Sequence, residues 1–225
     1  LFRSAIFIAG EVEIIRPVFA FIGAVLATVA VYQMARSKAG MNVERLVLSG
    51  VIVTTMLSSI IVLLTSVLDA AKLRSFTFWL LGDLSQASKW GFILISASAL
   101  LGTAALLIQA RSLNLLMIGE RDAFDFGVEV GRVRALVFGV SAALVGVSVS
   151  AGGSVGYVGL IVPHLVRMMV GSDNRNVIPL AAIGGATFVV LADTIARVAI
   201  APRELPVGAI TALLGAPLFI YLLRK

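Results

Sequence analysis

Asp193 and Arg197 are charged residues four positions apart inside one long apolar segment of this 225-residue chain. Residues i and i+4 share one face of a helix, so this carboxylate and this guanidinium can pair. A charge at the centre of a bilayer costs about 2.5–3.5 kcal/mol on insertion scales. Two interpretations stay open: a structural pair that neutralises itself, or an arginine that presents its charge to a partner or a pathway.

His164 is the only histidine and follows Pro163 in another apolar segment. A lone histidine there is more often a packed, hydrogen-bonding residue than a ligand. The chain also lacks cysteine, and an ordinary transition-metal site needs several His, Cys or carboxylate ligands, so we expect no metal. Ser154 could act as a nucleophile with His164 as its base. Their ten-residue spacing spans about 15 Å along a helix against the about 3 Å required, so we predict no catalytic residues.

A glycine-rich turn at 152–159 runs directly into the segment that carries His164. In a membrane, glycines let helices and re-entrant backbone approach closely, and Gly and Pro mark helices that are broken for a purpose. We therefore expect one group of residues to serve helix packing or a pathway: Gly152, Gly153, Gly156, Gly159, Pro163, His164 and Asp193.

The composition fixes the setting of these residues. The chain is 60% hydrophobic and only 13% charged, whereas a soluble domain carries about 25% charge. Lipid must therefore be its solvent. The net charge of +6 does not indicate nucleic acid, because the basic residues stand singly at the ends of apolar spans and form no basic face. No Walker A sequence is present, so the chain has no P-loop of its own.

The apolar segments predict an all-α, polytopic transmembrane bundle in a single domain, 1–225. Each span needs about 20 mostly apolar residues. We predict the tail of a helix at 1–10, and spans at 17–35, 46–68, 90–110, 135–150, 157–171, 177–200 and 207–223. Because the chain opens within a helix and shows no signal-peptide pattern, we expect it to begin inside a longer protein.

Lysine and arginine are unequally divided between the two sets of loops. Eleven of the 18 fall on one side and five on the other. The positive-inside rule therefore places the first set, and the C-terminus, in the cytoplasm.

Two loops are more than turns. The segment 69–89, on the outside, mixes aromatic and charged residues and predicts a short amphipathic helix at the interface. The segment 111–134, on the inside, predicts two short helices broken at Gly119 and Gly127. It is either a solvated loop or a docking surface for a cytosolic partner, since apolar side chains on a water-facing loop need cover.

Four stretches in series resemble the FecCD-type permeases, the membrane subunits of ABC importers for iron–siderophores, haem and cobalamin. They are Gly156-Tyr-Val-Gly-Leu-Ile-Val-Pro-His-Leu-Val-Arg167, Asn114-Leu-Leu-Met-Ile-Gly-Glu120, Leu191-Ala-Asp-Thr-Ile-Ala-Arg197, and Glu204-Leu-Pro-Val-Gly208 with Leu214-Gly-Ala-Pro-Leu-Phe219. The resemblance implies a ten-span fold whose N-terminal spans, roughly its first third, are absent here. It also implies a homodimer with two cytosolic ABC ATPase subunits and an extracytoplasmic substrate-binding protein.

The resemblance also implies roles for particular residues. The segment 111–134 becomes the cytoplasmic coupling loop, and the expected ATPase contacts are Leu116, Gly119, Glu120, Arg121, Asp122 and Ala123. Arg197 matches the family's outward arginine, which meets an acidic residue of the binding protein. Lys72 and Arg74 are docking candidates by location.

These features together predict a transport permease of a bacterial or archaeal cytoplasmic membrane, and not an enzyme. Its cargo is a metal chelate, ferric siderophore first, then haem or cobalamin. No cofactor is bound by this chain; ATP and Mg are used by the partner ATPase. The alternatives are an ion-coupled secondary transporter that uses Asp193, and a purely structural membrane subunit.

Overall fold

The computed structural model describes residues 19, 21–37, 40–41, 43–84, 89–200 and 204–223. The predicted helix tail at 1–10 and the start of the first span lie outside these ranges. The chain divides into two compact units, Leu1–Thr77 and Phe78–Lys225, and each is described by itself.

The described part of the first unit contains two apolar helices with a short strand ladder between them. They are Phe21–Ala35 and α2, Val43–Val67. Between them β1 (Arg36–Ser37) and β2 (Gly40–Met41) form a two-residue antiparallel ladder, which the sequence did not predict. Most of α3, Ala70–Leu80, also belongs to this unit. Asp69 begins α3 by accepting a hydrogen bond from the Lys72 amide at 2.9 Å, so the predicted short helix in 69–89 is present.

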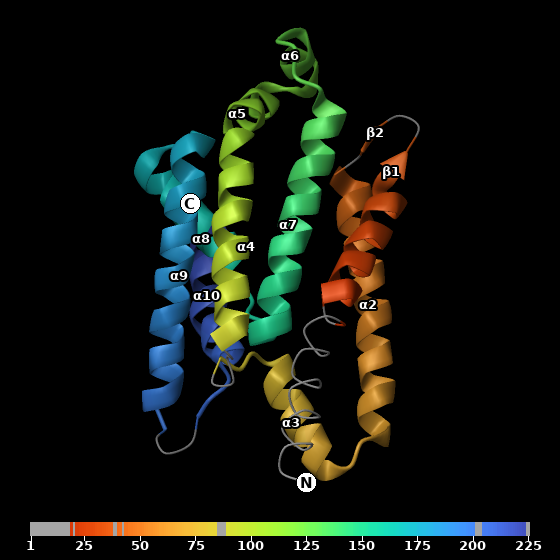
Figure 1. The fold of residues 1–225 in the computed structure, drawn as a ribbon, viewed down its shortest axis with the longest axis vertical. Coiled ribbons are helices and arrows are strands. Elements are labelled where there is room, and N and C mark those ends of the chain that lie inside the picture. The colour runs from red at the N-terminus through yellow and green to blue at the C-terminus, as the bar shows by residue number, and fades with distance from the viewer. Residues whose placement is uncertain are drawn as a thin grey trace. The chain divides into compact units, whose positions relative to one another are not determined.

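The second unit is a bundle of long helices with two short ones at one end (Figure 1). The long helices are α4 (Lys89–Ile108), α7 (Val130–Gly152), α9 (Asn174–Val198) and α10 (Val207–Leu223), with the shorter α8 (Val158–Val170). The short helices are α5 (Ala110–Ile118) and α6 (Glu120–Asp125). α8 packs on α9, α4 on α7, and α10 on α9.

Among the described residues, four helices are long and apolar enough to cross a membrane: Glu44–Val67, Gly91–Ile108, Val130–Gly152 and Asn174–Val198. Three shorter apolar helices accompany them: Phe21–Ala35, Val158–Val170 and Val207–Tyr221. Every predicted span that falls on described residues therefore coincides with a helix, and the all-α transmembrane fold class is confirmed. Many large apolar side chains of α2, such as Val51, Met56 and Leu63, are exposed in the chain, as lipid contact requires.

Candidate functional site

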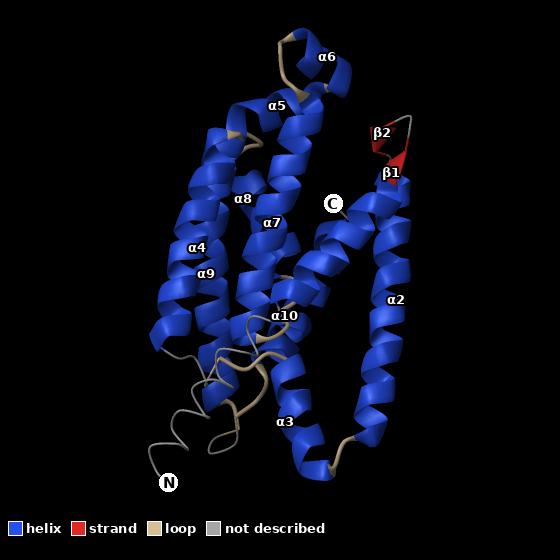
Figure 2. Cartoon of the chain, turned by 45° about the vertical axis from the view of Figure 1, so that its right-hand side comes forward, coloured by secondary structure: helices blue, strands red, loops and turns tan. Residues whose placement is uncertain are grey.

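Two regions of the second unit gather the polar and exposed residues of interest, one at each end of α9. The first is the α5–α6 tip, residues 110–125, which stands at the end of α4 and α7 in both views (Figures 1 and 2). Its helices are broken where the backbone becomes extended at Gly119 (φ 161, ψ 152). After α6 the chain turns at Gly127, which has a left-handed φ of 82°. The two predicted helix breaks are confirmed.

A small apolar cluster joins the tip to the start of α7. Ala123 is completely buried, and it clusters with Val128 and Val133. The partly buried side chains that pack against this cluster are Leu115, Leu116, Val130 and Val137. Of the six residues predicted to contact an ATPase, Ala123 and Leu116 thus face the interior of the tip, whereas Glu120, Arg121 and Asp122 are exposed.

The tip and Phe126, which follows it directly, expose large apolar side chains beside the charged ones. Phe124 and Phe126 are 70% and 72% exposed, and Ile118 and Met117 are also exposed. The two phenylalanines belong to the loop segment that the sequence suggested as a docking surface, but they are not among its six expected ATPase contacts. Covering such surface is worth about 25 cal/mol per Å², so the tip is suited to contact another surface.

One ion pair holds the tip against α7. Glu120, at the start of α6, pairs with Arg134, whose side chain is 25% exposed. A second pair, Glu129 with Arg132 at 2.8 Å, lies beside it but is far more exposed. Only the first of these two connects different helices, so Glu120 fixes the direction in which α6 points.

A side-chain joint connects the tip to α9, and we call it the Asn114 joint. The Asn114 amide on α5 donates to Asp173 Oδ1 at 2.6 Å. Its carbonyl oxygen accepts from both the backbone N and the side-chain Nδ2 of Asn174, at 2.9 and 2.8 Å. Asp173 in turn accepts from the Arg175 amide at 2.9 Å, as the N-cap of α9. The Arg175 amide, followed by the Asn114 side chain, lowers the pKa of the Asp173 carboxyl below its ordinary value of 3.8.

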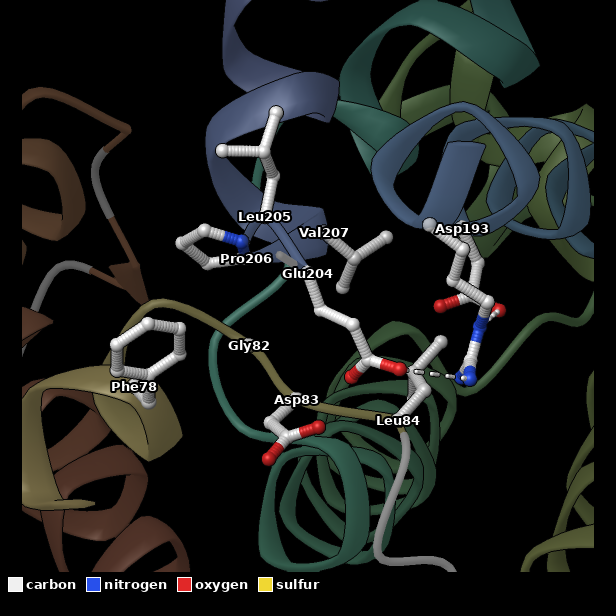
Figure 3. Close-up of a pocket in the computed structure, with 10 residues that line it drawn as sticks. Phe78, Gly82, Asp83, Leu84, Asp193, Glu204, Leu205, Pro206 and Val207 are labelled. Atoms are coloured by element: carbon white, nitrogen blue, oxygen red, sulfur yellow. Dashed lines mark hydrogen bonds and ion pairs between the residues drawn. The ribbon is translucent and has the colours of Figure 1, made fainter. Parts of the chain in front are cut away.

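The second region is a small pocket of about 40 Å³ at the other end of α9, which we call the Arg197 pocket (Figure 3). Arg197 Nε donates to Asp193 Oδ2 at 2.8 Å, so the predicted i,i+4 pair forms. The arginine also lies 3.7 Å from Glu204 Oε1, a partner that the sequence did not predict. The remaining lining residues are Phe78, Gly82, Asp83, Leu84, Leu205, Pro206 and Val207.

Backbone hydrogen bonds join three distant stretches around this pocket. The amides of Val207 and Gly208 donate to the carbonyls of Gly82 and Leu81, at 3.1 and 3.0 Å, and the Asp83 amide donates to Gly152 at 3.1 Å. The close approach depends on glycine, because a Cβ on Gly208 would lie 2.6 Å from the Ser154 carbonyl oxygen. A Cβ on Gly153, which has a φ of 72°, would overlap the Trp79 carbonyl oxygen.

The other predicted site residues are dispersed. A Cβ on Gly152 would lie 2.7 Å from Leu84, whereas Cβ atoms on Gly156 and Gly159 would meet nothing within 4 Å. Pro163 lies inside α8, where His164 is exposed. In the first unit, Lys72 pairs with Asp69 at 3.1 Å, and Arg74 is exposed. Within the described ranges, no cluster of three His, Cys, Asp or Glu could hold a metal.

Comparison with known proteins identifies the bundle. The chain is 41% identical over 207 residues to a hemin transport system permease protein of Yersinia pestis, covering 92% of the chain and 61% of that protein. It is 42% identical over 206 residues to a cobalamin import system permease protein of Halobacterium salinarum, covering 91% and 55%. The chain thus spans little more than half the length of these relatives.

A solved structure has the same helical membrane fold as this chain. It is an inward-facing conformation of a metal-chelate type ABC transporter, similar with a TM-score of 0.76 and 37% identity over 82% of this chain and 60% of the other. With the four apolar helices, these relatives indicate a multi-pass membrane protein. The model of the FecCD transport family matches residues 2–225, and the chain therefore belongs to the FecCD transport family.

Proposed function

We propose that the chain is the larger part of a permease subunit in an ATP-binding-cassette importer for a metal chelate. Two similar proteins carry hemin and cobalamin in their names, which supports a large chelate as cargo. Ferric siderophore is our first choice of cargo, followed by haem and cobalamin. The chain supplies the route through the membrane and no bond chemistry, and ATP with Mg binds to a separate ATPase subunit.

The observation that carries this proposal is the exposed apolar surface of the α5–α6 tip. The apolar cluster around Ala123 holds the tip against α7 while Phe124 and Phe126 stay exposed. Such a rigid apolar projection on the cytoplasmic side fits the socket of an ATPase subunit, because large apolar anchors dominate the energy of protein interfaces. In this proposal 111–134 is the coupling loop, and the C-terminus is cytoplasmic.

The Arg197 pocket is the proposed docking point for an extracytoplasmic binding protein. Arg197 is 41% exposed on its side chain, and its closest ion-pair partner among the described residues is Asp193 at 2.8 Å. Glu204, at 3.7 Å and 55% exposed, is the weaker partner, so an incoming carboxylate competes with Glu204 for the guanidinium. Lys72 and Arg74 are further docking candidates. A second copy of the chain and the lipid of the cytoplasmic membrane complete the proposed surroundings.

The test measures ATP hydrolysis in liposomes. The permease, expressed at its full natural length with its neighbouring ATPase, is assayed with and without the binding protein. Glu120→Arg places two arginines together where Glu120 and Arg134 now pair, and the repulsion weakens the contact between α6 and α7. We expect the binding protein to stimulate the wild type and to leave this variant unstimulated.

Glu129→Arg is the matched control, because it makes the same charge reversal in an exposed pair outside the tip. It should behave as the wild type does. If no ATPase co-purifies and Glu120→Arg changes nothing, the importer proposal is wrong, and uptake driven by an ion gradient becomes the function to test.

A further inference from the structure

We propose that Asn114 is a positioning residue that transmits movement of the α5–α6 tip to helix α9, and thereby to the Arg197 pocket. This inference rests on the proposed function, since it assumes that an ATPase moves the tip and that a binding protein acts at the other end. Asn114 lies within the proposed coupling loop but is not among the six residues proposed to contact the ATPase, and its side chain is bonded to residues 173 and 174.

The joint is a defined contact between segments far apart in the chain. Asn114 and Asn174 are separated by 60 positions, yet one amide side chain makes three hydrogen bonds to residues 173 and 174, all between 2.6 and 2.9 Å. Asn174 is also buried and reaches Met117 Sδ at 3.4 Å. A fully satisfied polar cluster of this kind resists sliding, because breaking it leaves several donors and acceptors unpaired.

Helix α9 continues from this joint to the Arg197 pocket without a break. Asn174 and Arg197 lie within the same 25-residue helix, about 35 Å apart at 1.5 Å per residue. The far end is also fixed, because the Leu205 amide donates to the Ala196 carbonyl at 3.1 Å. Pro179 lies inside α9 near the joint and removes one main-chain hydrogen bond there, but the helix continues past it to the pocket. A continuous helix held at both ends can pass on a displacement applied at either end, which is the physical requirement for coupling between two sites.

A double variant can restore the hydrogen bonds of the Asn114 joint after a single substitution has broken them. Recovery of stimulated hydrolysis in that double variant distinguishes a coupling role of the joint from a role in folding alone. In Asn114→Asp, a carboxylate replaces the amide that now donates to Asp173, so two negative groups meet and the joint breaks. In the double variant Asn114→Asp with Asp173→Asn, donor and acceptor exchange places. Both present bonds end on Oδ1 of Asp173, so the introduced amide has to turn its NH2 group toward position 114 and its oxygen toward the Arg175 amide. The introduced carboxylate then accepts from Asn174 and from that NH2 group.

The experiment compares basal and binding-protein-stimulated ATP hydrolysis in liposomes that contain the complete importer. We expect Asn114→Asp to keep basal hydrolysis within about twofold, because the exposed surface of the tip is intact. Stimulation should fall about tenfold, and the double variant should recover at least half of it. Asn176→Asp is the matched control: it makes the same substitution on an exposed side chain in the same helical turn, and it should retain full stimulation.

Asn114→Ala, which removes the hydrogen bonds without adding repulsion, is the second single variant and should lose stimulation as well. The proposal is overturned if both single variants keep wild-type stimulation. It is also overturned if basal and stimulated rates fall in parallel without recovery in the double variant, or if no Asn114 variant assembles, since Asn114 would then serve folding alone. If the wild type itself shows no stimulated hydrolysis, the proposed function fails first.

Discussion

The two ends of helix α9 are built in different ways. At the α5–α6 tip, side chains make the contacts: an apolar cluster around Ala123, the Glu120–Arg134 ion pair and the Asn114 joint. At the Arg197 pocket, much of the structure is backbone against backbone, with the amides of Val207 and Gly208 bonded to the carbonyls of Gly82 and Leu81.

This difference indicates which amino-acid substitutions each region tolerates. Side-chain contacts can be exchanged for others of similar shape and polarity, so the tip can vary its surface while it keeps its core. Backbone contacts at this distance exclude a Cβ atom, so the pocket end depends on glycine at fixed positions. We therefore expect substitutions at the pocket end to act on folding, and substitutions on the tip surface to act on association.

The largest effect should come from Gly153→Ala. The residue has a φ of 72°, and an added Cβ would overlap the Trp79 carbonyl oxygen, so the backbone strain and the steric conflict add. We expect a loss of about 3 kcal/mol or more in the free energy of unfolding, measured as a lower thermal midpoint in detergent. Gly139→Ala on α7, where a Cβ meets nothing within 4 Å, is the control and should not lower the midpoint. Equal thermal midpoints for the two variants would refute the claim that close backbone contacts at the Arg197 pocket require glycine at position 153.

An intermediate effect should come from the double substitution Phe124→Ala and Phe126→Ala. Both side chains are about seven-tenths exposed, so the thermal midpoint of the permease should stay unchanged. Affinity for the ATPase subunit should fall by about 2 kcal/mol or more, roughly 30-fold, as for aromatic anchors of an interface. Titration of the solubilised permease with the ATPase subunit measures this affinity. Unchanged affinity would remove the tip surface from the proposed contact.

The smallest effect should be the acid sensitivity that Asp173 gives to the Asn114 joint. Its pKa is lowered in the folded state from 3.8, so the unfolded chain takes up the proton first as the pH falls. The contribution of Asp173 to stability is thus complete well above pH 3.8 and is lost as the pH drops through the lowered value. Unfolding of the wild type and of Asp173→Asn, followed from pH 7 downward, should converge only at acidic pH. A stability difference that stays constant across this range would contradict the assignment.

The sequence predicted the parts of the fold that depend on local patterns. The long apolar runs located the spans, because a helix that crosses lipid must be apolar along about 20 residues. Gly119 and Gly127 marked the ends of short helices, and the i,i+4 spacing of Asp193 and Arg197 predicted their ion pair. Each of these depends on residues that are close in the sequence.

The contacts that the sequence did not predict are of two kinds. Some join residues far apart in the chain, and others depend on which way a side chain of a short helix points, which the hydrophobic periodicity does not determine. Asn114 and Asp173 are 59 positions apart, and no pattern connects them. Glu204 follows residues 201–203, which fall outside the described part, and its approach to Arg197 depends on the path of the chain after α9. Ala123 and Phe124 are adjacent, yet one is fully buried and the other 70% exposed, because a helix of six residues is too short to show a clear apolar face.

The backbone bonds at the Arg197 pocket also set an order of events during synthesis. The carbonyls of Leu81 and Gly82 have no access to their hydrogen-bond donors, the amides of Gly208 and Val207, until those residues are synthesised. At about 5–20 residues per second, this takes roughly 6 to 25 seconds. Until then the membrane contains a bundle that is closed at the tip and open at the pocket. The contacts of this end therefore form later during synthesis than the contacts of residue 114 with residues 173 and 174 at the tip.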